Sequence, residues 1–247
     1  DEPLIGDLLA DPDTFYKEVG VRKPSELRTF RFGRSDDCDG YPTALMMDKM
    51  LVHTRFNFLQ GLTMTLQYPG WHNVMNVLAA AAAAKYMGVN GAQIADRASN
   101  TKLTEMRFET IHSPNGYTMI NDAYNASPSS VAAALEFLTE LKGYASKIIV
   151  LGDMLELGAE ELKYHQNLGR DLNPETIDYV FTFGELAKTI AEEAKNTFPP
   201  NRVQSHTNLD SLETAVRQVL KTGDIMLVKG SRGMKLEELI RRLEPQK

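Results

Sequence analysis

The 247-residue sequence is poor in cysteine and has no excess of basic residues. Its one cysteine, Cys38, excludes a disulfide within the chain and is typical of proteins from reducing compartments. The formal net charge of −6 predicts no basic surface for nucleic acid or anionic lipid. The longest apolar candidate for a membrane span, residues 78–84, is far shorter than the roughly 20 residues that a spanning helix needs. We therefore expect a cytoplasmic protein that binds no nucleic acid and does not insert into a membrane.

Two further features are missing. The chain begins without methionine and without a basic segment followed by an apolar one, so we expect no signal peptide and a piece of a longer protein. No segment fits Gly-x-x-x-x-Gly-Lys-Ser/Thr, the loop that wraps phosphates in many ATPases. An acidic stretch at residues 35–40 lacks the ligand spacing of a calcium loop, and it is better explained as a solvated turn. The sequence therefore predicts no metal site.

From about residue 107 onward, apolar runs alternate with helical patterns. This alternation predicts an α/β fold built from βαβ units on a mainly parallel sheet, with helices on both faces. The expected strands are 117–120, 147–151, 178–183, 202–205 and 224–228. The expected helices are 128–141, 160–172, 186–196, 209–221 and 232–243.

The first hundred residues have a different pattern. Segments 55–60 and 62–68 show partial alternation around Gly61, which predicts two antiparallel strands with one solvated face. A helix is expected over 73–87, ended by Gly88, and a second over 92–98. No complete set of βαβ units is present, so this part is expected to be the end of a domain whose beginning is missing. The boundary is placed near Glu105.

The most informative segment is Asn-Asp-Ala-Tyr-Asn-Ala-Ser-Pro-Ser-Ser, residues 121–130. Ser127 occupies an expected N-cap position, and Pro128 the first position of a helix. Asp122, Tyr124 and Asn125 then gather at the carboxyl end of a strand, where open α/β sheets bind ligands. A capped loop with solvated polar groups is the alternative.

A second segment opens the alanine-rich helix. His72, Asn73 and Asn76 lie in its first turn, and the two amides share a face and offer the donors and acceptors that read a base such as adenine. Ordinary helix capping explains them equally well. Arg107, at the proposed hinge, is suited to phosphate oxygens, although it is also compatible with a surface charge or a structural ion pair.

Two loops complete the candidate site. Gly-Asp-Met-Leu-Glu-Leu-Gly at 152–158 places Asp153 and Glu156 at the end of a strand, either toward an amine or metal or as helix caps. Lys-Gly-Ser-Arg at 229–232 is suited to a carboxylate or phosphate at a helix start, with a plain turn as the alternative. His165 falls on an apolar helix face and is expected to be a hydrogen-bonded core residue.

The order and spacing of these motifs resemble the Mur ligases, and within them the members that add D-alanyl-D-alanine. The motifs are Gly-x-His-Asn-x-x-Asn, an arginine, Asp-x-Tyr-Asn-Ala-x-Pro, Leu-Gly-Asp-Met-x-Glu-Leu-Gly and Lys-Gly-Ser-Arg. The resemblance implies that residues 1–105 are the end of a central ATP-binding domain. Residues 106–247 would then be a complete, Rossmann-like, doubly wound C-terminal domain.

The resemblance also implies roles. His72, Asn73 and Asn76 would lie at the adenine of ATP, Arg107 at its phosphates and Asp122 at the ribose, with Arg107 and Asp122 essential for catalysis. Tyr124 and Asn125 would line the nucleotide and dipeptide side. The residues expected to face the dipeptide or peptide carboxylates are Asn125, Asp153, Glu156, Lys229, Ser231 and Arg232. The magnesium ligands would lie in the missing upstream part.

The implied substrates are ATP, UDP-N-acetylmuramoyl-tripeptide and D-Ala-D-Ala, used by a monomeric enzyme in peptidoglycan precursor synthesis. The isolated chain would be inactive because it lacks the phosphate-binding half of the ATP site. Two alternatives remain: another Mur-type or folylpolyglutamate-type amide ligase, or a non-catalytic nucleotide- or amino-acid-binding module.

Overall fold

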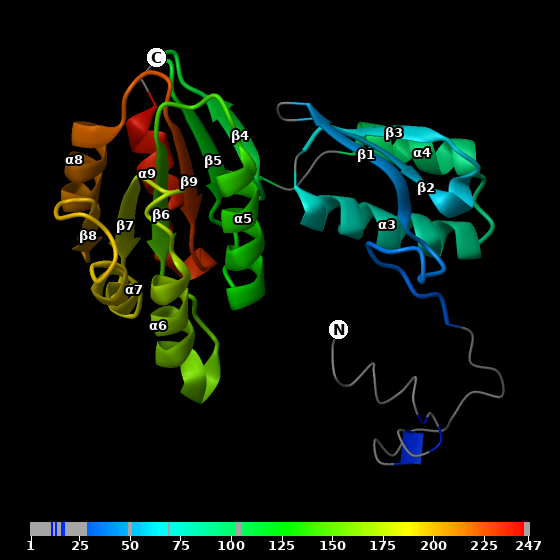
Figure 1. The fold of residues 1–247 in the computed structure, drawn as a ribbon, viewed down its shortest axis with the longest axis horizontal. Coiled ribbons are helices and arrows are strands. Elements are labelled where there is room, and N and C mark those ends of the chain that lie inside the picture. Colours follow the sequence, from blue (N-terminus) through cyan, green and yellow to red (C-terminus); the bar gives the residue numbers. More distant parts are fainter. Residues whose placement is uncertain are drawn as a thin grey trace.

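The computed structural model describes residues 11, 13, 16–17, 29–48, 51–68, 70–101 and 105–244. Within them the chain forms a three-stranded sheet with two helices, followed by a six-stranded sheet with helices on both faces (Figure 1). We call residues 29–101 the upstream unit and residues 105–244 the sheet unit. No helix in the described parts of the chain has the length and apolar character needed to span a bilayer.

The upstream unit is an antiparallel sheet in the order β1-β2-β3, with both helices packed against it. Its buried core includes Val52 and Phe56 from the middle strand and Leu78 from the first helix. Ala81 of the same helix is also buried in this core. The elements are β1 (Pro42–Asp48), β2 (Leu51–Phe56), η1 (Asn57–Leu59), β3 (Thr63–Leu66), α3 (Trp71–Tyr86) and α4 (Gly91–Asn100).

The antiparallel pair predicted in this unit is confirmed, but its expected limits were wrong. The strand expected over 55–60 ends at Phe56, because the next three residues form a 3₁₀ turn and Gln60 adopts a left-handed φ of 54°. Strand β1 was not predicted. Gly88, with a φ of 87°, follows the C-cap residue Met87 of α3, as expected for a glycine that terminates a helix.

The sheet unit has the strand order β4-β5-β9-β6-β7-β8. All neighbouring pairs are parallel except β4 with β5, so the predicted mainly parallel sheet is confirmed. The strands are β4 (Glu109–His112), β5 (Thr118–Asp122), β6 (Lys147–Gly152), β7 (Tyr179–Phe183), β8 (Val203–His206) and β9 (Ile225–Lys229).

Helices cover both faces of this sheet (Figure 1). Successive strand residues alternate between two cores: Ile149 and Leu227 pack with α5, α6 and α7, whereas Ile148 and Met226 pack with α8 and α9. The predicted doubly wound α/β architecture is therefore confirmed. The helical elements are α5 (Pro128–Glu140), η2 (Gly158–Glu160), α6 (Glu161–Asp171), α7 (Ala187–Ala194), α8 (Leu209–Val219), η3 (Arg232–Met234) and α9 (Glu237–Leu243).

Two details differ from the prediction. Strand β4 was not predicted because it has only four residues, which are partly exposed and not continuously apolar. The single helix expected over 232–243 is interrupted, since a 3₁₀ turn leads to Lys235 in a left-handed conformation, with a φ of 53°, before α9 begins. The loop after β9 is therefore not a regular helix start.

The two units meet where the start of α3 approaches α5. The ring of His72 lies 4.6 Å from that of Phe108, which lies 5.2 Å from the ring of Phe137 on α5. Arg34 lies over the ring of Trp71, with its guanidinium carbon 4.6 Å from the ring centroid. Its Nη1 also lies 3.9 Å from the carboxylate oxygen Oε1 of Glu136 on α5. Side chains from both units therefore surround the start of α3.

Candidate functional site

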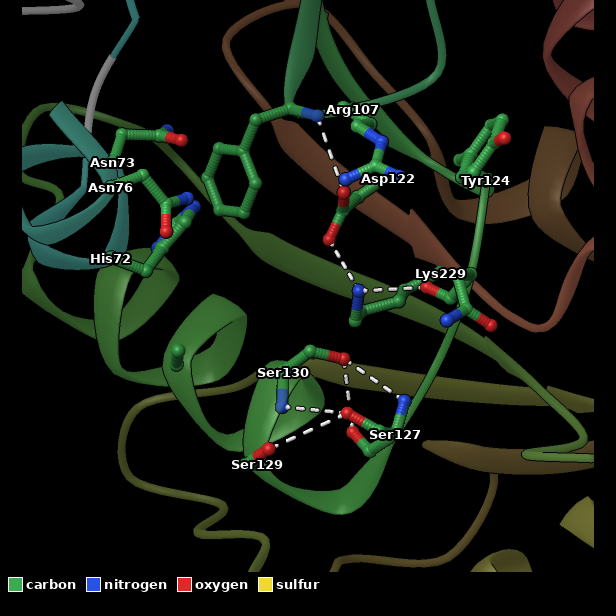
Figure 2. Close-up of a pocket in the computed structure, with 13 residues that line it drawn as sticks. His72, Asn73, Asn76, Arg107, Asp122, Tyr124, Ser127, Ser129, Ser130 and Lys229 are labelled. Atoms are coloured by element: carbon green, nitrogen blue, oxygen red, sulfur yellow. Dashed lines mark hydrogen bonds and ion pairs between the residues drawn. The ribbon is translucent and has the colours of Figure 1, made fainter. Parts of the chain in front are cut away.

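A pocket of about 450 Å³ lies at the carboxyl ends of β5 and β9, between the starts of α3 and α5 (Figure 2). This edge of the sheet is where open α/β folds bind ligands. All seven residues predicted at the nucleotide line the pocket, together with one residue predicted at the peptide side and five that were not predicted. The lining residues are His72, Asn73, Asn76, Arg107, Phe108, Asp122, Tyr124, Asn125, Ser127, Ser129, Ser130, Ala133 and Lys229.

The start of α3 forms one wall. Gly70 precedes the helix with a φ of 97°, and a Cβ there would lie 2.7 Å from the imidazole carbon of His72, so glycine is required. This turn brings His72, Asn73 and Asn76 to the pocket, as Figure 2 shows. The imidazole and amide groups offer directional hydrogen bonds without a fixed charge.

The opposite wall includes Arg107, between two residues in strained conformations. Met106 and Phe108 have backbone φ values of 61° and 53°, in the left-handed region that residues other than glycine rarely adopt. Such strain is commonest at functional sites. The guanidinium of Arg107 lies over the ring of Tyr124, with 4.4 Å between its central carbon and the ring centroid. This cation–π contact orients both side chains at the pocket.

Asp122 and Lys229 form a buried ion pair at the base of the pocket (Figure 2). They are register partners on the adjacent parallel strands β5 and β9, each the last residue of its strand. The ammonium donates to Asp122 Oδ2 over 2.5 Å and to the carbonyl oxygen of Asn125 over 3.1 Å. The other carboxylate oxygen, Oδ1, accepts from the backbone N–H of Phe108 over 3.3 Å.

Serines at the start of α5 form the floor. Ser127 caps this helix and Pro128 occupies its first position, as predicted, and Ser130 completes a reciprocal capping box. The sequence prediction used Ser127 only as a cap and did not assign Ser129 or Ser130 to the site. Their position directly after Asn125, on the first turn of a helix that begins at the ligand-binding edge, was the available signal.

The environment of His72 lowers the pKa of its imidazole. Burial is the main cause, since it disfavours the charged form. The carboxylate of Asp122 acts in the opposite direction, and the ammonium of Lys229 adds to the lowering. His72 is therefore neutral near pH 7, with one ring nitrogen able to donate and the other able to accept.

The loops 152–158 and 229–232 are linked to each other. The N–H of Ser231 donates to the carbonyl oxygen of Asp153 over 3.0 Å, and Ser231 Oγ accepts from the N–H of Leu155 over 2.9 Å. This close packing favours glycine at both strand ends, because a Cβ on Gly230 would lie 3.1 Å from the Cα of Gly152 and a Cβ on Gly152 would lie 3.3 Å from the Cα of Gly230. The two motifs therefore form one structural unit.

Four residues predicted at the peptide side lie outside the pocket lining. The buried carboxylate of Asp153 accepts from the N–H of Ala187 at the start of α7, over 2.7 Å, so it caps that helix. Ser231 joins the two loops, and Arg232 pairs with Glu237 over 2.9 Å. Glu156 is exposed, with a φ of 65°. Their roles toward a peptide stay predictions.

His165 is a core residue, as predicted. Its Nε2 accepts from the N–H of Met154 over 2.9 Å, and its Nδ1 lies 2.7 Å from the carbonyl oxygen of Glu161. The ring is fully buried. His165 therefore holds the 152–158 loop against α6.

The arrangement combines neutral hydrogen-bonding groups on one wall with a cation and a paired carboxylate on the other. Such a set is suited to a ligand with a polar aromatic part and an anionic part, as in a nucleotide. Among the described residues, no group of three or more His, Cys, Asp or Glu side chains is arranged to hold a metal ion.

Comparison with known proteins places this chain in a family. Residues 106–232, more than half of the chain, match the family described as "Mur ligase, glutamate ligase domain". The UDP-N-acetylmuramoyl-tripeptide–D-alanyl-D-alanine ligase of Bacillus subtilis is 45% identical over 187 residues, which are 75% of this chain and 41% of that protein. The enzyme of the same name from Escherichia coli is 32% identical over 182 residues, 72% of this chain and 38% of that protein.

Solved structures agree with these matches. A MurF structure from Acinetobacter baumannii superposes with a TM-score of 0.74 at 27% identity, covering 87% of this chain and 46% of that one. A MurF ligase from Thermotoga maritima, solved in complex with ADP, shares the fold with a TM-score of 0.72 at 23% identity, covering 94% and 50%. The chain spans half or less of the length of these proteins. With the α/β fold and the family match on more than half of its length, this chain belongs to the Mur ligase family.

Proposed function

We propose that this chain is part of an ATP-dependent ligase that adds D-alanyl-D-alanine to UDP-N-acetylmuramoyl-tripeptide in peptidoglycan precursor synthesis. The 45% identity to the B. subtilis ligase of that name supports this substrate pair over those of other amide ligases. Because the chain spans 41% of that relative, the activity is proposed for the whole enzyme and not for this segment alone.

One observation carries the proposal. Seven residues from three separate segments, 72–76, 107 and 122–125, converge on one pocket at the ligand-binding edge of the sheet. These are the residues that the resemblance to Mur ligases assigns to the nucleotide. A purely structural module would have no need for this convergence. Dipeptide-dependent phosphate release, tested below, separates a ligase from a non-catalytic nucleotide-binding module.

In the proposed complex, the neutral wall formed by His72, Asn73 and Asn76 binds the adenine. Arg107 reaches the phosphates, where a guanidinium makes paired hydrogen bonds to anionic oxygens. Asp122 accepts from the ribose hydroxyls. Each of its oxygens already accepts one hydrogen bond and keeps a second acceptor position.

The proposed reaction has two steps. The terminal carboxylate of the tripeptide takes the γ-phosphoryl group of ATP, and the amine of D-Ala-D-Ala then attacks the acyl phosphate and displaces inorganic phosphate. The chain's residues contribute positioning and charge stabilisation, which depend on closure of the two units around the substrates. Tyr124 and Asn125 line the side on which the peptide is expected to approach.

The remaining assignments are also proposals. Residues 1–105 would complete a central ATP-binding domain, and residues 106–247 would form the C-terminal domain. The enzyme would act as a cytoplasmic monomer. Magnesium would be bound by residues upstream of this chain, so we assign no residue described here to it. Asp153, Glu156, Ser231 and Arg232 remain candidates for the peptide side.

The test is phosphate release by the enzyme that contains this chain, with ATP, magnesium, UDP-muramoyl-tripeptide and D-Ala-D-Ala. We expect release that depends on the dipeptide and is not supported by L-lysine or glutamate in its place. The 247-residue chain alone, assayed in parallel, should release no phosphate. Release that depends on one of the other amino substrates would assign the chain to another branch of amide ligases.

A further inference from the structure

We propose that Lys229 is a positioning residue of the nucleotide pocket, which holds Asp122 and through it the segment that carries Arg107. The resemblance to Mur ligases assigned Lys229 to a peptide carboxylate. This inference rests on the proposed function and replaces that role with a different one. It follows from burial, strand register and hydrogen bonding, each described below.

Burial limits what Lys229 can contact. Its side chain is 3% exposed, whereas the side chain of Arg232, three residues later, is 54% exposed. A buried ammonium needs a partner in place of water. Lys229 has that partner in Asp122, whose own side chain is 13% exposed. A second anion, such as a peptide carboxylate, would have to compete with a carboxylate already in contact.

Strand register fixes the pair. Asp122 and Lys229 are aligned across β5 and β9, in the middle of a parallel sheet whose strands are held on both sides. The backbones of both residues are therefore held in place by the sheet, and their side chains start side by side at its edge.

Hydrogen bonds extend from this pair to both segments that carry pocket residues. Lys229 donates to the carbonyl oxygen of Asn125, which lies next to Tyr124. Asp122 accepts from the N–H of Phe108, which lies next to Arg107. The N–H of Tyr124 also donates to the carbonyl oxygen of Met106, over 3.1 Å. Lys229 thus supports the two segments whose side chains form the Arg107–Tyr124 stack.

Electrostatics gives the pair a second effect. An unpaired carboxylate at the base of the pocket would repel the phosphates of a nucleotide, because like charges disfavour each other in a partly buried site. Lys229 compensates the charge of Asp122 and still leaves the carboxylate oxygens of Asp122 able to accept further hydrogen bonds. We therefore expect Lys229 to control nucleotide affinity, with little effect on the affinity for the dipeptide.

The experiment compares four variants of the enzyme that contains this chain: Lys229→Met, Asp122→Asn, the double variant and Lys188→Met. Lys188 is the control, since it is exposed on α7, lies outside the pocket lining and pairs with the exposed Glu192 at 3.9 Å. Binding of ADP is measured by calorimetry, and the KM values for ATP and for D-Ala-D-Ala are measured separately. Circular dichroism reports whether each variant folds.

We expect Lys229→Met to weaken ADP binding and raise the KM for ATP by about tenfold or more, while the KM for the dipeptide changes by less than about twofold. The double variant should bind ADP as Asp122→Asn does, within about threefold, because both changes remove the same interaction. Lys188→Met should be unchanged.

Two results would overturn the inference. One is a KM for D-Ala-D-Ala raised about tenfold with normal ADP binding, which would place Lys229 at the peptide. The other is a double variant that binds ADP about tenfold more weakly than Asp122→Asn, which would give Lys229 an independent role. If Lys229→Met fails to fold, the comparison of Asp122→Asn with the double variant still decides, since the latter leaves no buried ammonium unpaired. A wild-type enzyme that binds ADP without dipeptide-dependent ligation would refute the proposed function alone.

Discussion

The two walls of the pocket differ in their chemistry and in the way they are held. The wall from the sheet unit carries Arg107, Asp122 and Lys229, and its charges are positioned by contacts within that unit. The wall from the upstream unit carries His72, Asn73 and Asn76, all neutral at pH 7. The contacts that position the charged residues all lie within the sheet unit. The environment of His72, in contrast, includes residues of both units.

In the proposed function, this difference gives the two walls different roles. A charged wall that is fixed within one core can stabilise anionic groups without first being assembled. A neutral wall on a second unit can select the shape and edge of a base and then leave, because it loses no buried ion pair when the units separate. The following changes test this difference in roles, in order of decreasing expected effect.

Asp122→Ala should have the largest effect, because it leaves the ammonium of Lys229 buried without its partner. We expect the free energy of unfolding to fall by about 3–5 kcal/mol, with loss of turnover. Urea denaturation measures the first effect and phosphate release the second. The control is Glu192→Ala, which removes an exposed ion pair with Lys188 and should cost at most about 1 kcal/mol. Equal losses in the two variants would contradict the importance of the buried pair.

Arg107→Ala should reduce kcat/KM of the proposed ligase by roughly 100-fold, because the proposed function places this guanidinium at the phosphates, where negative charge develops. Stability should be nearly unchanged, since Arg107 is exposed. Arg202→Ala is the matched control: Arg202 also lies over a tyrosine ring, that of Tyr179, but outside the pocket. An active Arg107→Ala enzyme would remove this residue from the site.

Asn76→Ala should weaken nucleotide binding by about fivefold, as expected for one neutral hydrogen bond worth about 1 kcal/mol. The residue is exposed at the pocket, so thermal stability should change little. Asn100→Ala, on α4 outside the pocket, serves as the control. Calorimetry with ADP gives the comparison, and a loss as large as that of Arg107→Ala would mean that the neutral wall carries more than base recognition.

The pKa of His72 should report contact between the two walls. Burial against Phe108 lowers this pKa below the value of the unfolded chain, so the unfolded state binds the proton first on acidification. Stability that involves His72 is therefore complete above the unfolded pKa and decreases as pH falls below it. Phe108→Ala should return the pKa toward its ordinary value, as measured by NMR titration. The pKa of His206, also lowered by burial but on β8, should not move.

Strong periodicity made most of the sheet unit predictable from sequence. Residues such as Ile148–Leu151 are apolar without interruption because both faces of the parallel sheet are covered, and Ser127 with Pro128 marks the start of α5. Strand β4 was not predictable in this way. It is stabilised by pairing with β5, which is a tertiary contact, and not by its own pattern.

The site was predictable in part. Segment 122–125 could be placed at the ligand-binding edge because it follows a predicted strand. Segments 72–76 and 107 could be joined to it only through the order and spacing of motifs that resemble the Mur ligases, and the structure brings all three to one pocket. The pairing of Lys229 with Asp122 could not, because it depends on the strand order that places β9 beside β5, 107 residues away in sequence. Nor does local sequence reveal that Asp153 caps α7, since the helix it caps begins 34 residues later.

The contact between Gly152 and Gly230 has a consequence for how this protein can change. A Cβ on Gly230 would lie 3.1 Å from the Cα of Gly152, and a Cβ on Gly152 would lie 3.3 Å from the Cα of Gly230, so a methyl group on either glycine would press against the other loop. A substitution in one loop is therefore felt in the other, and variation in the two motifs must be coordinated. Attempts to exchange either loop for that of a relative should therefore transfer residues 152–158 and 229–232 together.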